Sequence, residues 1–162
     1  MIDSFIAWMN QFFSFENQLI TMFLSAFLSA SLLPGNSEIV FSAFIYQALD
    51  NANGSISTEI ILLFTCASVG NSLGGLTTYA LALFAPAPKP KAQRRKAARW
   101  ALHYSQKYGI WMLLFSWLPI VGDVLCGVAG WLRFNIWISI VFITIGKTIR
   151  YAILFWGIYT LY

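Results

Sequence analysis

The sequence predicts an all-α integral membrane protein built as an inverted repeat, each half supplying an amphipathic helix, a re-entrant hairpin and a transmembrane helix. Of its 162 residues, 59% are hydrophobic and only 10% are charged, too few charges to cover the surface of a soluble domain. Two apolar runs are long enough to cross a bilayer. Two further pairs of shorter apolar runs are each interrupted at a proline, which favours hairpins over complete spans.

The first segment, residues 2–15, has apolar side chains at helical spacing. Asp3, Asn10 and Gln11 occupy the opposite side. We expect an amphipathic helix lying in the membrane interface, with a short packed helix as the alternative.

The next two apolar runs predict the first hairpin. Residues 18–33 and 39–49 are both shorter than the ~20 residues that a span needs, and they meet at Pro34–Asn36. Two thin spans are the less favoured alternative, since Asn36 and Glu38 would then need an aqueous end at the break.

Residues 60–84 form the first run long enough to span the membrane. Its middle, Gly70–Gly75, is rich in small residues. Such residues let another helix backbone approach closely, so this stretch predicts a tight helix contact, and Asn71 could serve packing and function together.

A Pro- and Lys-rich linker at 85–92 leads to a predicted basic amphipathic helix at 93–108. Seven of the ten Lys and Arg residues lie between Lys89 and Lys107. Attraction to anionic lipid would hold this helix at the cytoplasmic leaflet. A nucleic-acid partner is disfavoured, because the basic block is short and lies between apolar segments. The basic residues placed at the membrane surface are Arg94, Arg95, Lys96 and Arg99.

The pattern then occurs a second time. Residues 110–118 and 124–132 are short apolar runs separated at Leu118-Pro119, and 134–162 is the second long span. We take the hairpin breaks to involve Pro34, Gly35, Pro119 and Gly122.

Four matches in the same order indicate an internal repeat within one membrane domain, residues 1–162. We place repeat one at about 2–85 and repeat two at about 93–162. The matched features are a Ser-Xaa-Leu-Pro motif ending at Pro34 and at Pro119, an acid four residues later (Glu38, Asp123), a small residue four further on (Ser42, Gly127), and Gly70-Asn71-Ser72 with Gly146-Lys147-Thr148.

The distribution of basic residues predicts the orientation. Cytoplasmic loops are enriched in Lys and Arg, so residues 86–108 are expected inside and the loop after Asp50 outside. Both termini are then periplasmic and the two halves are inverted, an arrangement common among transporters.

Four charged side chains are expected at bilayer depth: Glu38, Asp123, Lys147 and Arg150. Each costs about 2.5–3.5 kcal/mol on insertion scales, so such residues are usually functional. We predict a polar cavity at the hairpin tips, where Lys147 and Arg150 attract an anionic head group and the acids exchange protons or neutralise the cations. Asn36 and Asn71 join this candidate substrate and proton pathway. The alternative is a pair of structural salt bridges that lock hairpin to helix.

Other chemistry has little support in the sequence. His103 is the single histidine, and Cys66 and Cys126 lie in apolar runs without a partner at metal-ligand spacing. No catalytic constellation is present. We therefore expect no enzyme activity, no metal and no cofactor.

Four stretches, LLPGNSEIV, GNSLGGLTTY, KYGIWMLLFSWLPIVGDVLCGVAGW and GKTIRY, resemble the DedA superfamily (VTT or SNARE-associated domain), in particular its short YqaA-like branch. The resemblance covers about residues 20–152. It implies two oppositely oriented re-entrant hairpins and transport of undecaprenyl phosphate or phospholipid across the bacterial inner membrane, with some dependence on the proton gradient.

This chain departs from the family pattern at the charged positions. Typical members carry an acid two residues after the first proline, where this chain has Asn36, and arginines three residues either side of the second proline, where it has Ser116 and Gly122. Lys147 and Arg150 are the cations available instead, so substrate and ion coupling cannot be carried over directly.

We expect a multi-pass protein of the bacterial inner membrane that transports lipid. Its predicted partners are membrane lipids, anionic or phosphate-bearing, with a homo-oligomer left open. A non-transporting membrane-organising protein and a proton-coupled small-solute carrier are the alternatives.

Overall fold

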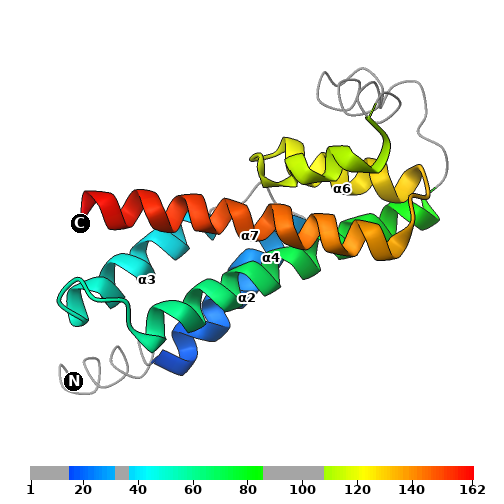
Figure 1. The fold of residues 1–162 in the computed structure, drawn as a ribbon. Coiled ribbons are helices and arrows are strands. Elements are labelled where there is room, and N and C mark those ends of the chain that lie inside the picture. The colour runs from blue at the N-terminus through cyan, green and yellow to red at the C-terminus, as the bar shows by residue number, and fades with distance from the viewer. Residues whose placement is uncertain (1–14, 32–36, 86–107) are drawn as a thin grey trace.

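The computed structural model describes residues 15–31, 37–85 and 108–162, and every regular element in these ranges is helical (Figure 1). The elements are α2 (Phe15–Ser31), α3 (Ser37–Asn51), α4 (Thr58–Phe84), the 3-10 helix η2 (Gly109–Trp117), α6 (Val121–Trp131) and α7 (Ile136–Leu161). The predicted all-α class is confirmed for these ranges. Three predictions lie outside the described residues, except for Phe15 and Tyr108 at their ends. They are the amphipathic helix at 2–15, the break at Pro34–Asn36 and the basic helix at 93–108 with Arg94, Arg95, Lys96 and Arg99.

Helices α4 and α7 are the two long elements, with 27 and 26 residues. At 1.5 Å per residue each is roughly 40 Å long, more than the ~30 Å of a bilayer core. The Ser57 hydroxyl caps α4, and the Asn135 side chain caps α7 by accepting from the Trp137 and Ile138 amides. Both helices are long and apolar enough to be candidate membrane spans, in agreement with the predicted spans at 60–84 and 134–162.

The long helices and α2 are apolar on both faces, the one that packs inside the bundle and the one that faces outward. Isoleucine and leucine side chains on these faces are 40% or more exposed, a pattern that is unfavourable in water and suited to lipid. Examples are Leu24, Leu28, Ile61, Leu73, Leu81, Ile145, Ile149 and Ile153. The chain therefore has the surface of a helical membrane protein.

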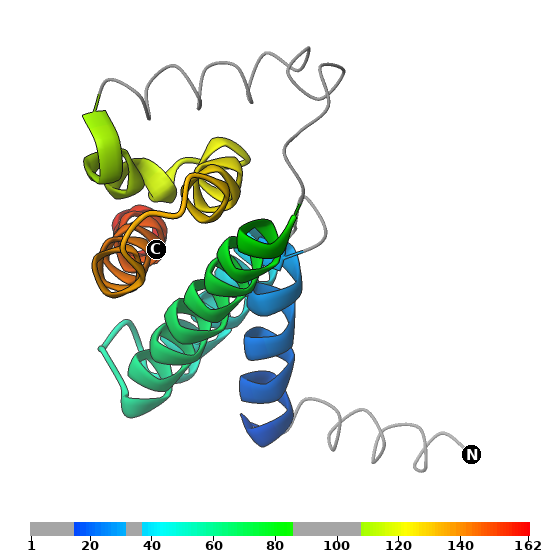
Figure 2. The same cartoon turned by 90° about the vertical axis from the view of Figure 1, so that its right-hand side faces the viewer.

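Two separate apolar cores occupy opposite ends of the bundle. The first joins α2 and α3 to the start of α4 and the end of α7, and the second joins η2 and α6 to the end of α4 and the start of α7. Figure 1 shows the same division: α2 and α3 lie towards the end that holds the C-terminus, and α6 lies towards the other. Viewed after a 90° turn, α2 and α4 form one side of the bundle, and α7 with α6 forms the other (Figure 2).

The second pair of short elements turns sharply after Pro119. Ile120 has a φ of 62°, which is unusual for a branched residue, and the Val121 amide donates to the Pro119 carbonyl at 2.6 Å. Helix α6 begins at Val121, three residues before the predicted start at 124. The first arm, η2, is a 3-10 helix, which hydropathy alone could not distinguish from an α-helix.

Small residues allow α4 to lie directly against the α2 backbone. A Cβ added at Gly70 would be 2.6 Å from the Phe23 carbonyl oxygen, and one at Gly74 would be 2.7 Å from the Ala30 Cβ. Both distances are too short for any side chain. The predicted small-residue contact is confirmed, and its partner is α2.

Candidate functional site

The four charged residues predicted at bilayer depth form two ion pairs, both on α7. Lys147 pairs with Asp123 in the first turn of α6, and Arg150 pairs with Glu38 in the first turn of α3. The two cations are three residues apart, so they share one face of α7. Each ion pair therefore joins α7 to a different short helix.

The basic and acidic members of these pairs differ in exposure. The Lys147 side chain is 0% exposed and that of Arg150 is 11% exposed, whereas Asp123 and Glu38 are 26% and 30% exposed. The carboxylates therefore form the accessible side of each pair, and the cations lie behind them.

A buried hydrogen-bonded network lies beside the Arg150–Glu38 pair. The Asn71 amide nitrogen on α4 donates to the Tyr151 hydroxyl at 3.3 Å, and this hydroxyl donates to the Ser37 hydroxyl at 3.2 Å. Ser29 on α2 donates to the same Ser37 oxygen at 2.8 Å. The network links four helices at the start of α3. We call Ser37, Glu38, Asn71, Arg150 and Tyr151 the α3 junction.

The α3 junction leaves two buried polar atoms without a hydrogen-bond partner. They are the Asn71 side-chain oxygen, an acceptor, and the Arg150 Nε, a donor. An unpaired buried polar atom is costly, and one in a native structure calls for an explanation such as a bound water or ligand. The junction thus has unused capacity to accept one hydrogen bond and to donate another.

Lys147 is accommodated by the absence of a side chain on α4. A Cβ at Gly75 would lie 3.4 Å from the Lys147 Cε and 3.5 Å from the Cys126 sulfur. The glycine therefore gives the lysine side chain room between α4 and α6, where its ammonium meets Asp123.

The structure places the predicted site residues in two groups. Glu38, Asn71 and Arg150 belong to the α3 junction, and Asp123 lies with Lys147. Asn36, Pro34 and Gly35 lie outside the described residues. Pro119 is at the turn, and Gly122 is in the first turn of α6, where a Cβ would strike the Ser116 carbonyl oxygen.

Sequence reasoning did not identify Tyr151 or Ser37 as site residues. Tyr151 is fully buried in the middle of a span, and its ring packs against Phe41 at a centroid distance of 4.9 Å. The available signal was its position directly after Arg150, deep in an apolar run, where a hydroxyl needs a partner.

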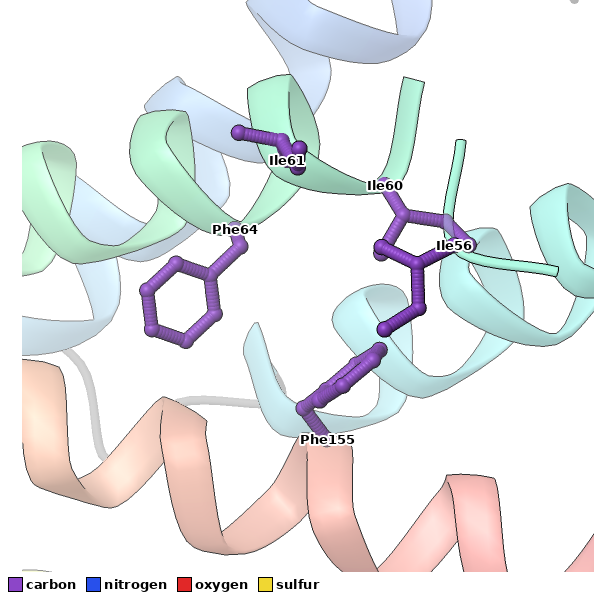
Figure 3. A pocket seen from close by; sticks show the side chains of 5 residues that line it. All are labelled: Ile56, Ile60, Ile61, Phe64 and Phe155. Atoms are coloured by element: carbon purple, nitrogen blue, oxygen red, sulfur yellow. The ribbon is translucent and has the colours of Figure 1, made fainter. Parts of the chain in front are cut away.

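An apolar pocket of about 240 Å³ lies at the start of α4, against α7 (Figure 3). Its lining contains no polar side chain, so it can contact hydrocarbon but has no side-chain group for hydrogen bonding or catalysis. The lining residues are Ile56, Ile60, Ile61, Phe64 and Phe155. Within the described ranges, no group of three or more His, Cys, Asp or Glu residues could hold a metal ion.

Comparison with known proteins identifies bacterial relatives. The chain is 47% identical over 139 residues to an uncharacterized protein of Haemophilus influenzae, covering 85% of each chain. It is 44% identical over 134 residues to the inner membrane protein YqaA of Escherichia coli, covering 83% of this chain and 86% of the relative, and the Shigella flexneri YqaA matches equally. No family model and no solved structure matches the chain.

Proposed function

Because this chain belongs to the family of the inner membrane protein YqaA, we propose that it moves phosphate-bearing lipids across the bacterial inner membrane, as a flippase of the DedA type. The lipid is undecaprenyl phosphate or a phospholipid, whose head group passes through the polar region at the tips of the two hairpins.

The observation that carries the proposal is the position of both ion pairs on the middle of a candidate span. Lys147 and Arg150 are the twelfth and fifteenth residues of the 26-residue α7, so both lie far from either end of the helix. Charges at that depth are expensive in lipid and are characteristic of transport pathways. A phosphate-bearing head group needs such cations to leave water.

The mechanism is alternating exposure of the polar region. Each hairpin, α2–α3 or η2–α6, approaches it from its own end of the bundle and is held to α7 by one ion pair. Separation of one pair uncovers a cation for the head group, and the released carboxylate takes up a proton or neutralises another charge. In the inverted-repeat topology the hairpins are re-entrant from opposite leaflets, with the termini periplasmic and residues 86–108 cytoplasmic.

Two further features support lipid as the substrate. The motifs of this chain resemble the DedA superfamily, whose members are implicated in lipid movement. Phe155, five residues after Arg150 on α7, lines the apolar pocket, and the other lining residues belong to α4 or lie just before it. A hydrocarbon chain in this pocket would therefore contact the helix that carries Arg150.

Reconstitution tests the proposal directly. The full-length chain is incorporated into vesicles with fluorescent phospholipids or a labelled polyprenyl phosphate, and transbilayer movement is followed by dithionite quenching or by extraction. We expect movement faster than in protein-free vesicles. Equal rates with and without the protein would refute the proposal.

The complete pairing of the four charges favours one competing function, that of a membrane-organising protein with structural ion pairs. The double variant Lys147→Met/Asp123→Leu separates the two. Loss of lipid movement with retained folding supports transport, whereas an unchanged phenotype with retained folding supports the structural role. A proton-coupled solute carrier predicts that substitution of Glu38 alters uptake of a soluble solute in the same vesicles.

A further inference from the structure

The two ion pairs make the polar region electrically neutral. Two carboxylates and two cations sum to zero, and the remaining described charges lie in the end turns of helices or in the turn between α6 and α7. Those residues are Glu16, Asp50, Glu59 and Arg133. The net charge of a ligand therefore adds directly to the net charge of the region.

A neutral site in a medium of low dielectric constant discriminates between ligands by net charge. While both carboxylates are ionised, an anionic head group leaves at least one uncompensated negative charge after it binds, and an isolated charge is strongly unfavourable away from water. A zwitterion leaves the region neutral, because each of its charges can face an opposite one. The arrangement of paired charges thus favours a zwitterionic head group.

The α3 junction also contains the kinds of groups that such a head group requires. The Glu38 carboxylate is at the accessible side, where an incoming ammonium meets it first, and Arg150 lies behind it. The two unpaired atoms match the same ligand: the Arg150 Nε can donate to a phosphate oxygen, and the Asn71 oxygen can accept from an ammonium.

We propose that the α3 junction binds the head group of a zwitterionic phospholipid that carries a primary ammonium. The phosphodiester is held by Arg150, and the ammonium is held by Glu38 and the Asn71 side-chain oxygen. A primary ammonium has three N–H donors, whereas a quaternary one has none, so the site prefers the primary form. This assignment rests on the proposed function and narrows its substrate class.

Competitive lipid binding to the full-length chain tests the proposal independently of transport. Native mass spectrometry of the protein in detergent micelles, with equimolar phosphatidylethanolamine, phosphatidylcholine and phosphatidylglycerol of identical chains, gives the relative occupancy. We expect phosphatidylethanolamine adducts to exceed phosphatidylglycerol adducts by about tenfold, with phosphatidylcholine between them. Equal occupancy, or an excess of phosphatidylglycerol, overturns the assignment.

The variant Glu38→Gln keeps the size of the side chain and makes the region positive by one unit. We expect its preference to move towards phosphatidylglycerol by about tenfold. Glu16→Gln is the matched control, because it makes the same chemical change at an exposed residue in the first turn of α2. A Glu38→Gln preference identical to that of Glu16→Gln would contradict the role of Glu38.

A neutral double variant keeps the test decisive if Glu38→Gln does not fold. Glu38→Gln/Arg150→Gln leaves the region neutral but removes both charged contacts, so we expect it to lose the preference for phosphatidylethanolamine over phosphatidylcholine. Retention of the wild-type preference in this variant overturns the proposal. Selective binding without transbilayer movement in vesicles would refute the transport function alone, and movement without head-group selectivity would refute this assignment alone.

Discussion

Replacing Asp123 with leucine leaves Lys147 without its carboxylate in a position where the lysine side chain is 0% exposed. Breaking a buried ion pair by removing one partner costs about 3–5 kcal/mol. We expect Asp123→Leu to lower the free energy of unfolding by the upper end of this range, about 5 kcal/mol, because the remaining ammonium has no access to water. Lys147→Met should cost about 3 kcal/mol, since the remaining Asp123 is 26% exposed and can be partly solvated.

The double variant Lys147→Met/Asp123→Leu removes both charges and restores apolar packing. Replacing a buried pair by hydrophobic residues is often neutral or stabilising, so its free energy of unfolding should lie within about 1 kcal/mol of the wild type. Reversible unfolding in bicelles, followed by tryptophan fluorescence, measures all three variants, with Glu16→Gln as the exposed control. Single costs below about 1 kcal/mol, or additive costs in the double variant, would refute the buried pair.

Three further predictions concern packing, the buried network and topology. Gly74→Ala should lower the free energy of unfolding by about 1–3 kcal/mol, because the added Cβ meets the Phe27 carbonyl and the Ala30 Cβ. Gly157→Ala is the control, since a Cβ there has nothing within 4 Å, and it should be neutral or stabilising by up to about 1 kcal/mol. Titration with urea or SDS measures the difference in unfolding free energy between the two variants. Tyr151→Phe removes a hydroxyl that both accepts and donates, so it should cost about 1–3 kcal/mol in the same assay, and no change would argue against the network. In a cysteine-free background, a cysteine in place of Ala52 should react with an impermeant maleimide added from the periplasm, and a cysteine in place of Arg95 should react only after permeabilisation. The reverse pattern of labelling would show that the chain has the opposite orientation in the membrane.

The long spans were predictable because they combine length with apolar composition, two properties that need no knowledge of tertiary contacts. The break at Pro119 was also predictable, since proline cannot continue a helix. The start of α6 at Val121 and the 3-10 form of η2 were not, because they depend on how tightly the chain turns at Ile120.

The site was predictable in its members and only partly in its pairing. Buried charges stand out in an apolar sequence, so Glu38, Asp123, Lys147 and Arg150 could all be named. The shared helix face of the two cations suggested that they hold one phosphate together. In the structure each cation meets an acid from a different short helix. Tyr151 forms hydrogen bonds with Asn71 and Ser37, which are 80 and 114 positions away in the sequence, and no local pattern encodes such contacts.

The close contact of Gly70 and Gly74 with α2 also restricts the path of a lipid in the proposed transport. The α4 backbone lies so close to the Phe23 and Ala30 positions that a methyl group does not fit between them. A hydrocarbon chain is far thicker, so the seam between α2 and α4 is closed to lateral passage. In the proposed transport, a head group therefore reaches Arg150 by a route other than the contact between α2 and α4.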